Sequence, residues 1–196
     1  MDFKDKVAVV TGGAQGIGRC IADEFQKAGA HVCVIDKQQG DHFVGDIADK
    51  QVLERFAQEV INRYGQVDYL INNALPLMKG IDECSYEEFQ YALNVGVTAP
   101  FYLSKLFSPF FAQGAAIVNI SSSRDRMSQP QTESYTAAKG GIAALTHALA
   151  VSLPLTIADV QASAAITTPI TATMTINILF FIAVQFYVVF WHLDCY

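Results

Sequence analysis

Apolar residues along the chain gather in two alternating kinds of segment. Short continuous runs rich in valine and isoleucine predict buried strands at residues 6–13, 31–36, 67–74 and 115–123. Longer stretches with helical spacing of apolar residues predict helices at residues 21–30, 49–65, 85–111 and 133–153. Strands that are apolar throughout are typical of parallel sheets covered on both faces. The pattern therefore predicts an α/β fold, a doubly wound parallel sheet of Rossmann type, for residues 1–153.

The C-terminal segment, residues 154–196, has a different composition. No lysine or arginine follows Lys139, and the only acidic residues after Glu133 are Asp159 and Asp194. The apolar stretch 174–192 is long enough to span a bilayer, but no Lys or Arg flanks it, which disfavours a membrane anchor. Two other interpretations are buried strands that complete the sheet, and residues that do not represent the native protein, as after a change of reading frame. We expect an atypical apolar segment of the same domain.

Charge and cysteine content exclude several function classes. The net charge is −6 and the basic residues are scattered, so no nucleic-acid-binding face is expected. The four cysteines lack the spacing of metal ligands and are expected to be reduced thiols. The first ten residues do not resemble a signal peptide. These features favour a cytoplasmic protein without a metal site.

A glycine-rich turn joins the first predicted strand to the first predicted helix. In "TGGAQGIG", Gly12, Gly16 and Gly18 allow the backbone to turn sharply and to approach a pyrophosphate, which the following helix N-terminus attracts. Asp36 ends the second strand, where a carboxylate accepts hydrogen bonds from the adenosine ribose and repels a 2′-phosphate. The pair of features predicts a dinucleotide site that prefers NAD to NADP.

A tyrosine and a lysine stand four residues apart in "SYTAAKGG". Tyr135 and Lys139 lie on one face of the predicted helix, so the ammonium can favour the phenolate form of the tyrosine. Three serines, 121–123, end the preceding strand, where ligands bind in such sheets. By themselves, the tyrosine and lysine could be an exposed helix pair and the serines a helix cap.

These motifs together resemble the short-chain dehydrogenase/reductase family. The resemblance covers residues 6–153 and rests on "TGGAQGIG", "NNA" at 72–74, Tyr135-x-x-x-Lys139, and a serine thirteen residues before the tyrosine. It implies that Tyr135 is the catalytic acid/base, that Lys139 is its electrostatic partner and that Ser122 holds the substrate oxygen. It also implies that Asn94 anchors a proton-relay water.

The same resemblance implies a set of cofactor-binding residues. Besides Tyr135 and Lys139, it assigns to the cofactor Gly12, Gly16, Ile17, Gly18, Asp36, Asp46, Ile47, Asn72 and Ala74. Asp46 and Ile47 are expected at the adenine, and Asn72 with Ala74 along the floor of the site. Two departures stand out: Leu75 replaces the usual glycine after "NNA", and the Pro-Gly turn that normally follows the next strand is absent.

The expected function is that of an NAD-dependent oxidoreductase that interconverts a secondary alcohol and a ketone. The alternatives are an NADP-linked 3-ketoacyl reductase, against which Asp36 argues, and a dinucleotide-binding protein without turnover. The two helical stretches 86–107 and 135–153 have broad apolar faces. In similar proteins such helices pair across a two-fold axis, so a homodimer or homotetramer is expected.

Overall fold

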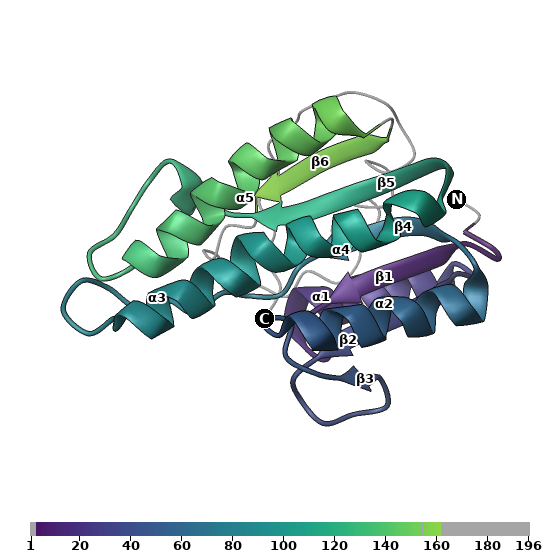
Figure 1. Cartoon of the computed structure of the whole chain (residues 1–196), viewed down its shortest axis with the longest axis horizontal. Coiled ribbons are helices and arrows are strands. Elements are labelled where there is room, and N and C mark those ends of the chain that lie inside the picture. The colour runs from purple at the N-terminus through teal and green to yellow at the C-terminus, as the bar shows by residue number, and fades with distance from the viewer. Residues whose placement is uncertain (1–2, 154, 162–196) are drawn as a thin grey trace.

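Six parallel strands form one sheet at the centre of the computed structural model, which describes residues 3–153 and 155–161 (Figure 1). Their order across the sheet is β3-β2-β1-β4-β5-β6. The strands are β1 (Val7–Thr11), β2 (His31–Asp36), β3 (Phe43–Val44), β4 (Val67–Asn72), β5 (Phe111–Ser121) and β6 (Thr156–Gln161). This is the strand order of the dinucleotide-binding Rossmann fold, and it confirms the predicted fold class.

Five α-helices join the strands: α1 (Gly16–Lys27), α2 (Lys50–Tyr64), α3 (Tyr86–Leu93), α4 (Ala99–Phe107) and α5 (Glu133–Ser152). Local signals in the sequence set several of their ends. Asp49 caps α2 by accepting from the Gln51 N–H at 2.7 Å, and Gly65, with φ of 72°, ends it. Ser85 and Glu88 form a reciprocal capping box at the start of α3.

Alternate residues of the buried strands pack on opposite faces of the sheet. Val7 and Val9 face a core that includes side chains from α2 and α4, whereas Ala8 and Val10 face a core formed with α1. Figure 1 shows α2, α4 and α5 along one side of the sheet and α1 behind it. Both faces of the strands are therefore buried, which explains why their sequences are continuously apolar.

The predicted helix 85–111 is interrupted. A π-helical turn, Asn94–Thr98, separates α3 from α4, and the Ala99 N–H bonds to the Asn94 carbonyl. The cause is Pro100, which has no N–H to donate to the Gly96 carbonyl and whose ring crowds that carbonyl in a regular helix. Several other boundaries also differ by a few residues: for example, α1 begins at Gly16 instead of residue 21, and β5 begins at Phe111 instead of residue 115.

The chain beyond residue 153 continues the sheet through β6, which pairs with β5 from Ala116–Thr156 to Ser121–Gln161. The apolar stretch 174–192 considered above as a membrane anchor lies outside the described residues. Within the part of the chain that the structure describes, no helix is both long enough and apolar enough to cross a membrane.

The carboxyl ends of the strands meet at one edge of the sheet. Thr11 pairs with Ile35 on one side and with Asn72 on the other, and Asn72 pairs with Asn119. Because all the strands are parallel, the segments that follow β1, β2, β4 and β5 emerge together at this edge. The candidate site residues come mainly from these segments.

Candidate active site

The glycine-rich turn after β1 leads directly into α1. Gln15, the N-cap residue, makes no side-chain capping bond, and the first turn has no acidic residue. The leading N–H groups of this helix are thus not capped by side chains, which is the arrangement that binds a phosphate. Gly16 has φ of 57°, and a Cβ placed there would have no atom within 4 Å, so the backbone is open at this point. The Ile17 side chain packs inward against the core beneath α1.

Gly12 and Gly18 allow the turn to pack closely against the segment that follows β4. A Cβ on Gly18 would lie 2.2 Å from the Gly12 carbonyl oxygen, and one on Gly12 would lie 2.8 Å from Ala74 Cα. Asn73 holds this packing together, since its Nδ2 donates to the carbonyls of Thr11 and Gly12 at 3.1 and 3.0 Å. The fold therefore requires glycine at both positions, and Ala74 lies directly against the turn.

Asp36 lies at the end of β2 with its carboxylate toward the glycine turn. It accepts from the Ala14 N–H and from the Gln38 N–H, each at 3.0 Å, and only 7% of the residue is exposed. An ionised carboxylate has lone pairs beyond these two bonds, so it can still accept from a sugar hydroxyl. Together with the uncapped helix, this arrangement fits the ribose and phosphates of a dinucleotide.

Asp46 is held by two hydrogen bonds next to the start of α2. Its Oδ1 accepts from the Ala48 N–H at 2.9 Å, and its Oδ2 accepts from the Tyr91 hydroxyl at 2.8 Å. Burial and this hydrogen bond raise the pKa of Tyr91 to about 12. The adjacent Ile47 side chain is buried in the core, so this residue presents mainly its backbone to a ligand.

A hollow of about 460 Å³ lies between the start of α2 and the helix α3. Asp46 and Asn94, both predicted site residues, are in its lining, which is formed by Asp46, Ala48, Asp49, Tyr86, Glu87, Gln90, Tyr91 and Asn94. The position of Asn94 at the first residue of the π-helical turn is one at which functional residues are frequent.

Asn72 and Asn73 point in different directions although they are adjacent. The Asn72 Nδ2 donates to Asn119 Oδ1 at 2.8 Å, and Asn119 in turn donates to Thr146 on α5 at 2.9 Å. Asn72 thus links β4, β5 and α5 inside the protein. It is Asn73, absent from the predicted site, that contacts the glycine turn.

Tyr135, Lys139 and Ser122 are brought together at the end of β5. The Lys139 Nζ lies 5.5 Å from the centre of the Tyr135 ring and donates to the Ile120 carbonyl at 2.6 Å. The Ser122 hydroxyl caps a short turn by accepting from the Arg124 N–H at 3.2 Å, and it is close enough to Tyr135 to lower the pKa of that phenol. The cap interpretation of the serine cluster therefore applies to Ser122, and its role toward a substrate oxygen stays a prediction.

Burial dominates the electrostatics of this group. The Lys139 side chain is almost completely buried, and burial lowers the pKa of its ammonium to about 8. Burial also raises the pKa of Tyr135, while the hydrogen bond with Ser122 and the positive charge of Arg124 lower it. The two opposing influences act on one phenol, which is the group predicted to exchange a proton.

The start of α5 is fastened to the segment that follows β4. The fully buried Ser134 hydroxyl accepts from the Lys79 N–H at 2.8 Å and lies 2.9 Å from the Leu77 carbonyl, and the Ser134 N–H donates to the Lys79 carbonyl at 3.1 Å. Gly80 permits this contact, since a Cβ there would lie 2.1 Å from Gln131 Cα. Ser134 was not among the predicted site residues, and its position directly before Tyr135 is the signal in the sequence that indicates it.

The π-helical turn also packs closely against α5. A Cβ on Gly96 would lie 2.7 Å from the Ala138 Cβ, and one on Gly141 would lie 2.7 Å from Val97 Cγ2. Small residues on both elements thus bring the turn that begins at Asn94 against the helix turn that includes Lys139.

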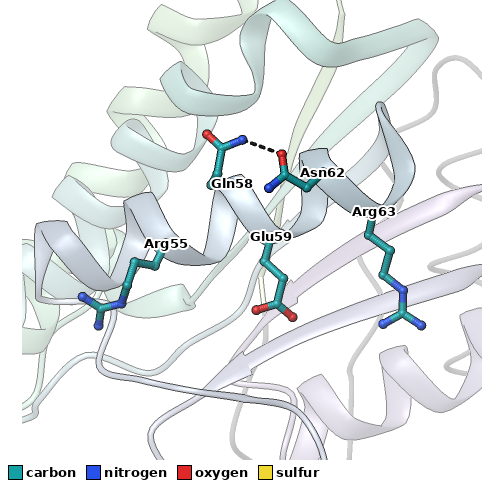
Figure 2. Close-up of a pocket in the computed structure, with 5 residues that line it drawn as sticks. All are labelled: Arg55, Gln58, Glu59, Asn62 and Arg63. Atoms are coloured by element: carbon teal, nitrogen blue, oxygen red, sulfur yellow. Dashed lines mark hydrogen bonds between the residues drawn. The ribbon is translucent and has the colours of Figure 1, made fainter.

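A further hollow of about 500 Å³ lies on α2 (Figure 2). Figure 2 shows that it is lined by successive turns of this helix, and that Gln58 donates to Asn62, at 2.7 Å. It includes none of the predicted site residues, and we interpret it as part of the solvated surface of α2.

Comparison with known proteins agrees with this geometry. Residues 6–179 match the sequence pattern of the short chain dehydrogenase family. The chain belongs to this family. An uncharacterized oxidoreductase of Thermotoga maritima is 40% identical over 170 residues, which cover 77% of this chain and 66% of the relative. The L-fucose dehydrogenase of Mus musculus is 34% identical over 164 residues, which cover 76% and 60%, respectively.

A solved structure is also similar. An apo SCOR enzyme from Clostridium thermocellum superposes with a TM-score of 0.78 at 38% identity, covering 85% of this chain and 75% of that one. The chain spans about three fifths to two thirds of the length of the curated relatives named above. Members of the short-chain dehydrogenase family are oxidoreductases that use NAD or NADP.

The family's usual glycine after "NNA" is replaced by Leu75, and the structure accommodates it without repacking the core. The Leu75 residue is 73% exposed. The packing of Gly12 against Ala74 is retained beside it. This departure from the family pattern therefore leaves the glycine turn closed.

Proposed function

We propose that this protein is an NAD-dependent dehydrogenase that interconverts a secondary alcohol and a ketone, with Tyr135 as the acid/base. The observation that carries the proposal is the grouping of Tyr135, Lys139 and Ser122 at the sheet edge where the glycine turn and Asp36 also lie. A binding site for a dinucleotide and a proton-transfer group are thereby combined in one site.

NAD, held by the glycine turn and Asp36, would supply the acceptor for the hydride of the alcohol carbon. Ser122 donates a hydrogen bond to the alcohol oxygen and orients it toward the phenol. The Tyr135 phenolate accepts the hydroxyl proton, so that the C–H and O–H bonds of the alcohol become the C=O bond of the ketone. The Lys139 ammonium favours the phenolate through its positive charge. In the reverse direction the protonated Tyr135 returns the proton to the oxygen.

Asp36 supports NAD rather than NADP as the cofactor. Its carboxylate is buried next to the glycine turn, where a 2′-phosphate would meet a negative charge with little solvent to screen it. Lys37 follows directly in the sequence and is exposed. An exposed cation contributes little compared with a buried anion at this position.

Sugars belong among the candidate substrates because the Mus musculus relative is an L-fucose dehydrogenase. Steroids, polyols and acyl thioesters are candidates from the chemistry of the site alone, since Ser122 and Tyr135 require only a hydroxyl or carbonyl group. A panel of such alcohols with NAD, followed by the absorbance of NADH, tests this range.

The Tyr135→Phe variant provides the decisive experiment. It keeps the ring but removes the hydroxyl that takes the proton, so turnover should fall by ~10² to 10⁴ while calorimetry still detects NAD binding. Full activity in the variant would refute the role of Tyr135. Tight NAD binding without turnover of any alcohol by the wild type would favour a dinucleotide-binding protein instead.

We also propose a homodimer formed by α4 and α5. The outer face of α5 exposes Ala144, His147, Ala148 and Val151, and Phe101 is exposed on α4. Apart from His147, these side chains are small or apolar and suit close helix pairing across a two-fold axis. Light scattering at micromolar concentration should give twice the mass of the chain, and a monomer would refute the proposal.

A further inference from the structure

Arg124 lies between the catalytic serine and the helix of the catalytic tyrosine. It belongs to a short turn, Ser123–Asp125, that follows Ser122, and its N–H donates to the Ser122 hydroxyl. Its guanidinium extends toward the start of α5, where Nη1 is 3.4 Å from the Thr132 hydroxyl and Nη2 is 2.5 Å from Gln129 Oε1. Thr132 is three residues before Tyr135. Arg124 therefore contacts both Ser122, at the end of β5, and the residues just before Tyr135, at the start of α5.

Among the side chains of residues 3–153, no acidic group balances the charge of Arg124. Both contacts of its guanidinium are to neutral oxygens. No carboxylate in that range forms an ion pair with it, whereas the nearby Lys79 pairs with Glu88 at 2.5 Å and Arg126 lies 3.7 Å from Asp125. Arg124 is partly exposed, and its guanidinium has N–H donors beyond the two that these bonds use.

The positive charge of Arg124 reaches the catalytic phenol. Burial raises the pKa of Tyr135, and the Arg124 charge is one of the two influences that lower it. The Lys139 ammonium, by comparison, is directed to the Ile120 carbonyl. Because Arg124 follows Ser122 by two residues and its charge acts on Tyr135, an anionic group of a substrate bound at this phenol would be attracted to the guanidinium.

We propose that Arg124 binds a carboxylate or phosphate group of the substrate, which makes the preferred substrate an anionic secondary alcohol. This inference rests on the proposed function. A guanidinium presents its N–H groups as a planar fork that matches two oxygens of such an anion. The bonds to Gln129 and Thr132 hold the fork in place, so binding requires little further ordering of the side chain.

Three sugars that differ only at one carbon test the proposal. Galactose, galacturonate and galactose 6-phosphate are compared as substrates with NAD, and 3-hydroxybutyrate is compared with its neutral methyl ester. The wild type should prefer the anionic member of at least one set by about 10- to 100-fold in kcat/KM, the range expected for hydrogen bonds to a charged group. Comparing galacturonate with galactose 6-phosphate shows whether the site prefers a carboxylate or a phosphate.

The Arg124→Met variant should remove this preference, so that kcat/KM falls about 10-fold more for the anionic member of a set than for the neutral member. Arg124→Lys, which keeps the charge but loses the fork, should retain part of the preference. Arg126→Met is the matched control, because this neighbouring arginine is exposed and should leave the preference unchanged. An equal loss for neutral and anionic substrates in Arg124→Met would show a structural role and overturn the proposal.

Calorimetric titration of the same anions into the protein with NADH present gives a readout that does not require turnover. Saturable binding that is lost in Arg124→Met supports the anion site even if no alcohol is oxidised, in which case only the proposed function fails. Turnover without any preference for the charged substrates refutes the anion site and leaves the proposed function intact. Absence of saturable binding and of preference for every anion also refutes the anion site.

Discussion

The buried Lys139 should make the stability of this protein rise with pH above neutrality. Burial lowers the pKa of its ammonium from 10.5 to about 8, so between these values the unfolded chain binds more protons than the folded chain at this site. The penalty for burying the charge is fully present well below pH 8. It decreases as the pH rises toward 10.5, and stability increases with it.

The magnitude follows from the two pKa values. With about 1.4 kcal/mol per pKa unit, the penalty is roughly 3 kcal/mol at pH 7. Integration between the two states leaves about half of it at pH 9.5, a gain of about 2 kcal/mol over that interval. The Lys139→Met variant has no titrating group at this position and should lack the gain. The variant also loses the hydrogen bond to the Ile120 carbonyl, so its stability differs from that of the wild type at both pH values, and only the change with pH reports the titration.

Urea unfolding of the wild type and of Lys139→Met at pH 7 and pH 9.5 measures the effect. For each protein, the unfolding free energy at pH 7 is subtracted from that at pH 9.5. The difference between the two results isolates Lys139 from the other groups that titrate in this range. Lys105→Met, a change of an exposed lysine on α4, is the matched control and should behave as the wild type does. If the stability of the wild type does not rise with pH relative to that of Lys139→Met, or if it falls, the assignment of a low pKa to this lysine is refuted.

Three further substitutions test the rest of the site. Gly18→Ala would bring a methyl group against the Gly12 carbonyl and Asn73, so it should destabilise the fold by ~1–3 kcal/mol and weaken NAD binding. Urea unfolding measures the stability and calorimetry the affinity, and an unchanged NAD affinity would contradict the role of this turn. Ser134→Ala leaves the part-buried Lys79 N–H without its side-chain acceptor, so it should lower stability by ~1–3 kcal/mol and lower kcat more than it raises KM. Steady-state kinetics that match the wild type would show that the Ser134 hydroxyl is not needed to position Tyr135. Asp36→Ala should reduce the ratio of kcat/KM with NAD to that with NADP while the rate at saturating NAD stays nearly the same, and a constant ratio would count against its role.

The elements of the fold and the spacing of the catalytic group follow from local properties of the sequence. The alternation of apolar runs with helical patterns predicts a parallel α/β sheet, because each pattern suits only one kind of element. Tyr135 and Lys139 lie side by side because any helix brings residues four apart onto one face. The glycine turn is recognisable for the same reason, since its position between a strand and a helix is visible in the chain itself.

Other features depend on how distant segments meet. Pro100 breaks the helix that the pattern 85–111 predicts, and the resulting wide turn forms against Ala138 because Gly96 has no side chain. Asn72 and Asn73 are indistinguishable by residue type. Their separate roles arise because Asn72 is the last residue of β4 and its side chain is paired with Asn119 of β5, whereas Asn73 lies past the strand and reaches the glycine turn. Ser134 likewise acquires its partners only through tertiary contacts, which join residues 55 to 57 positions apart. Hydrogen bonds of this range are set by the register of the strands and the packing of α5, and neither is encoded in a local pattern.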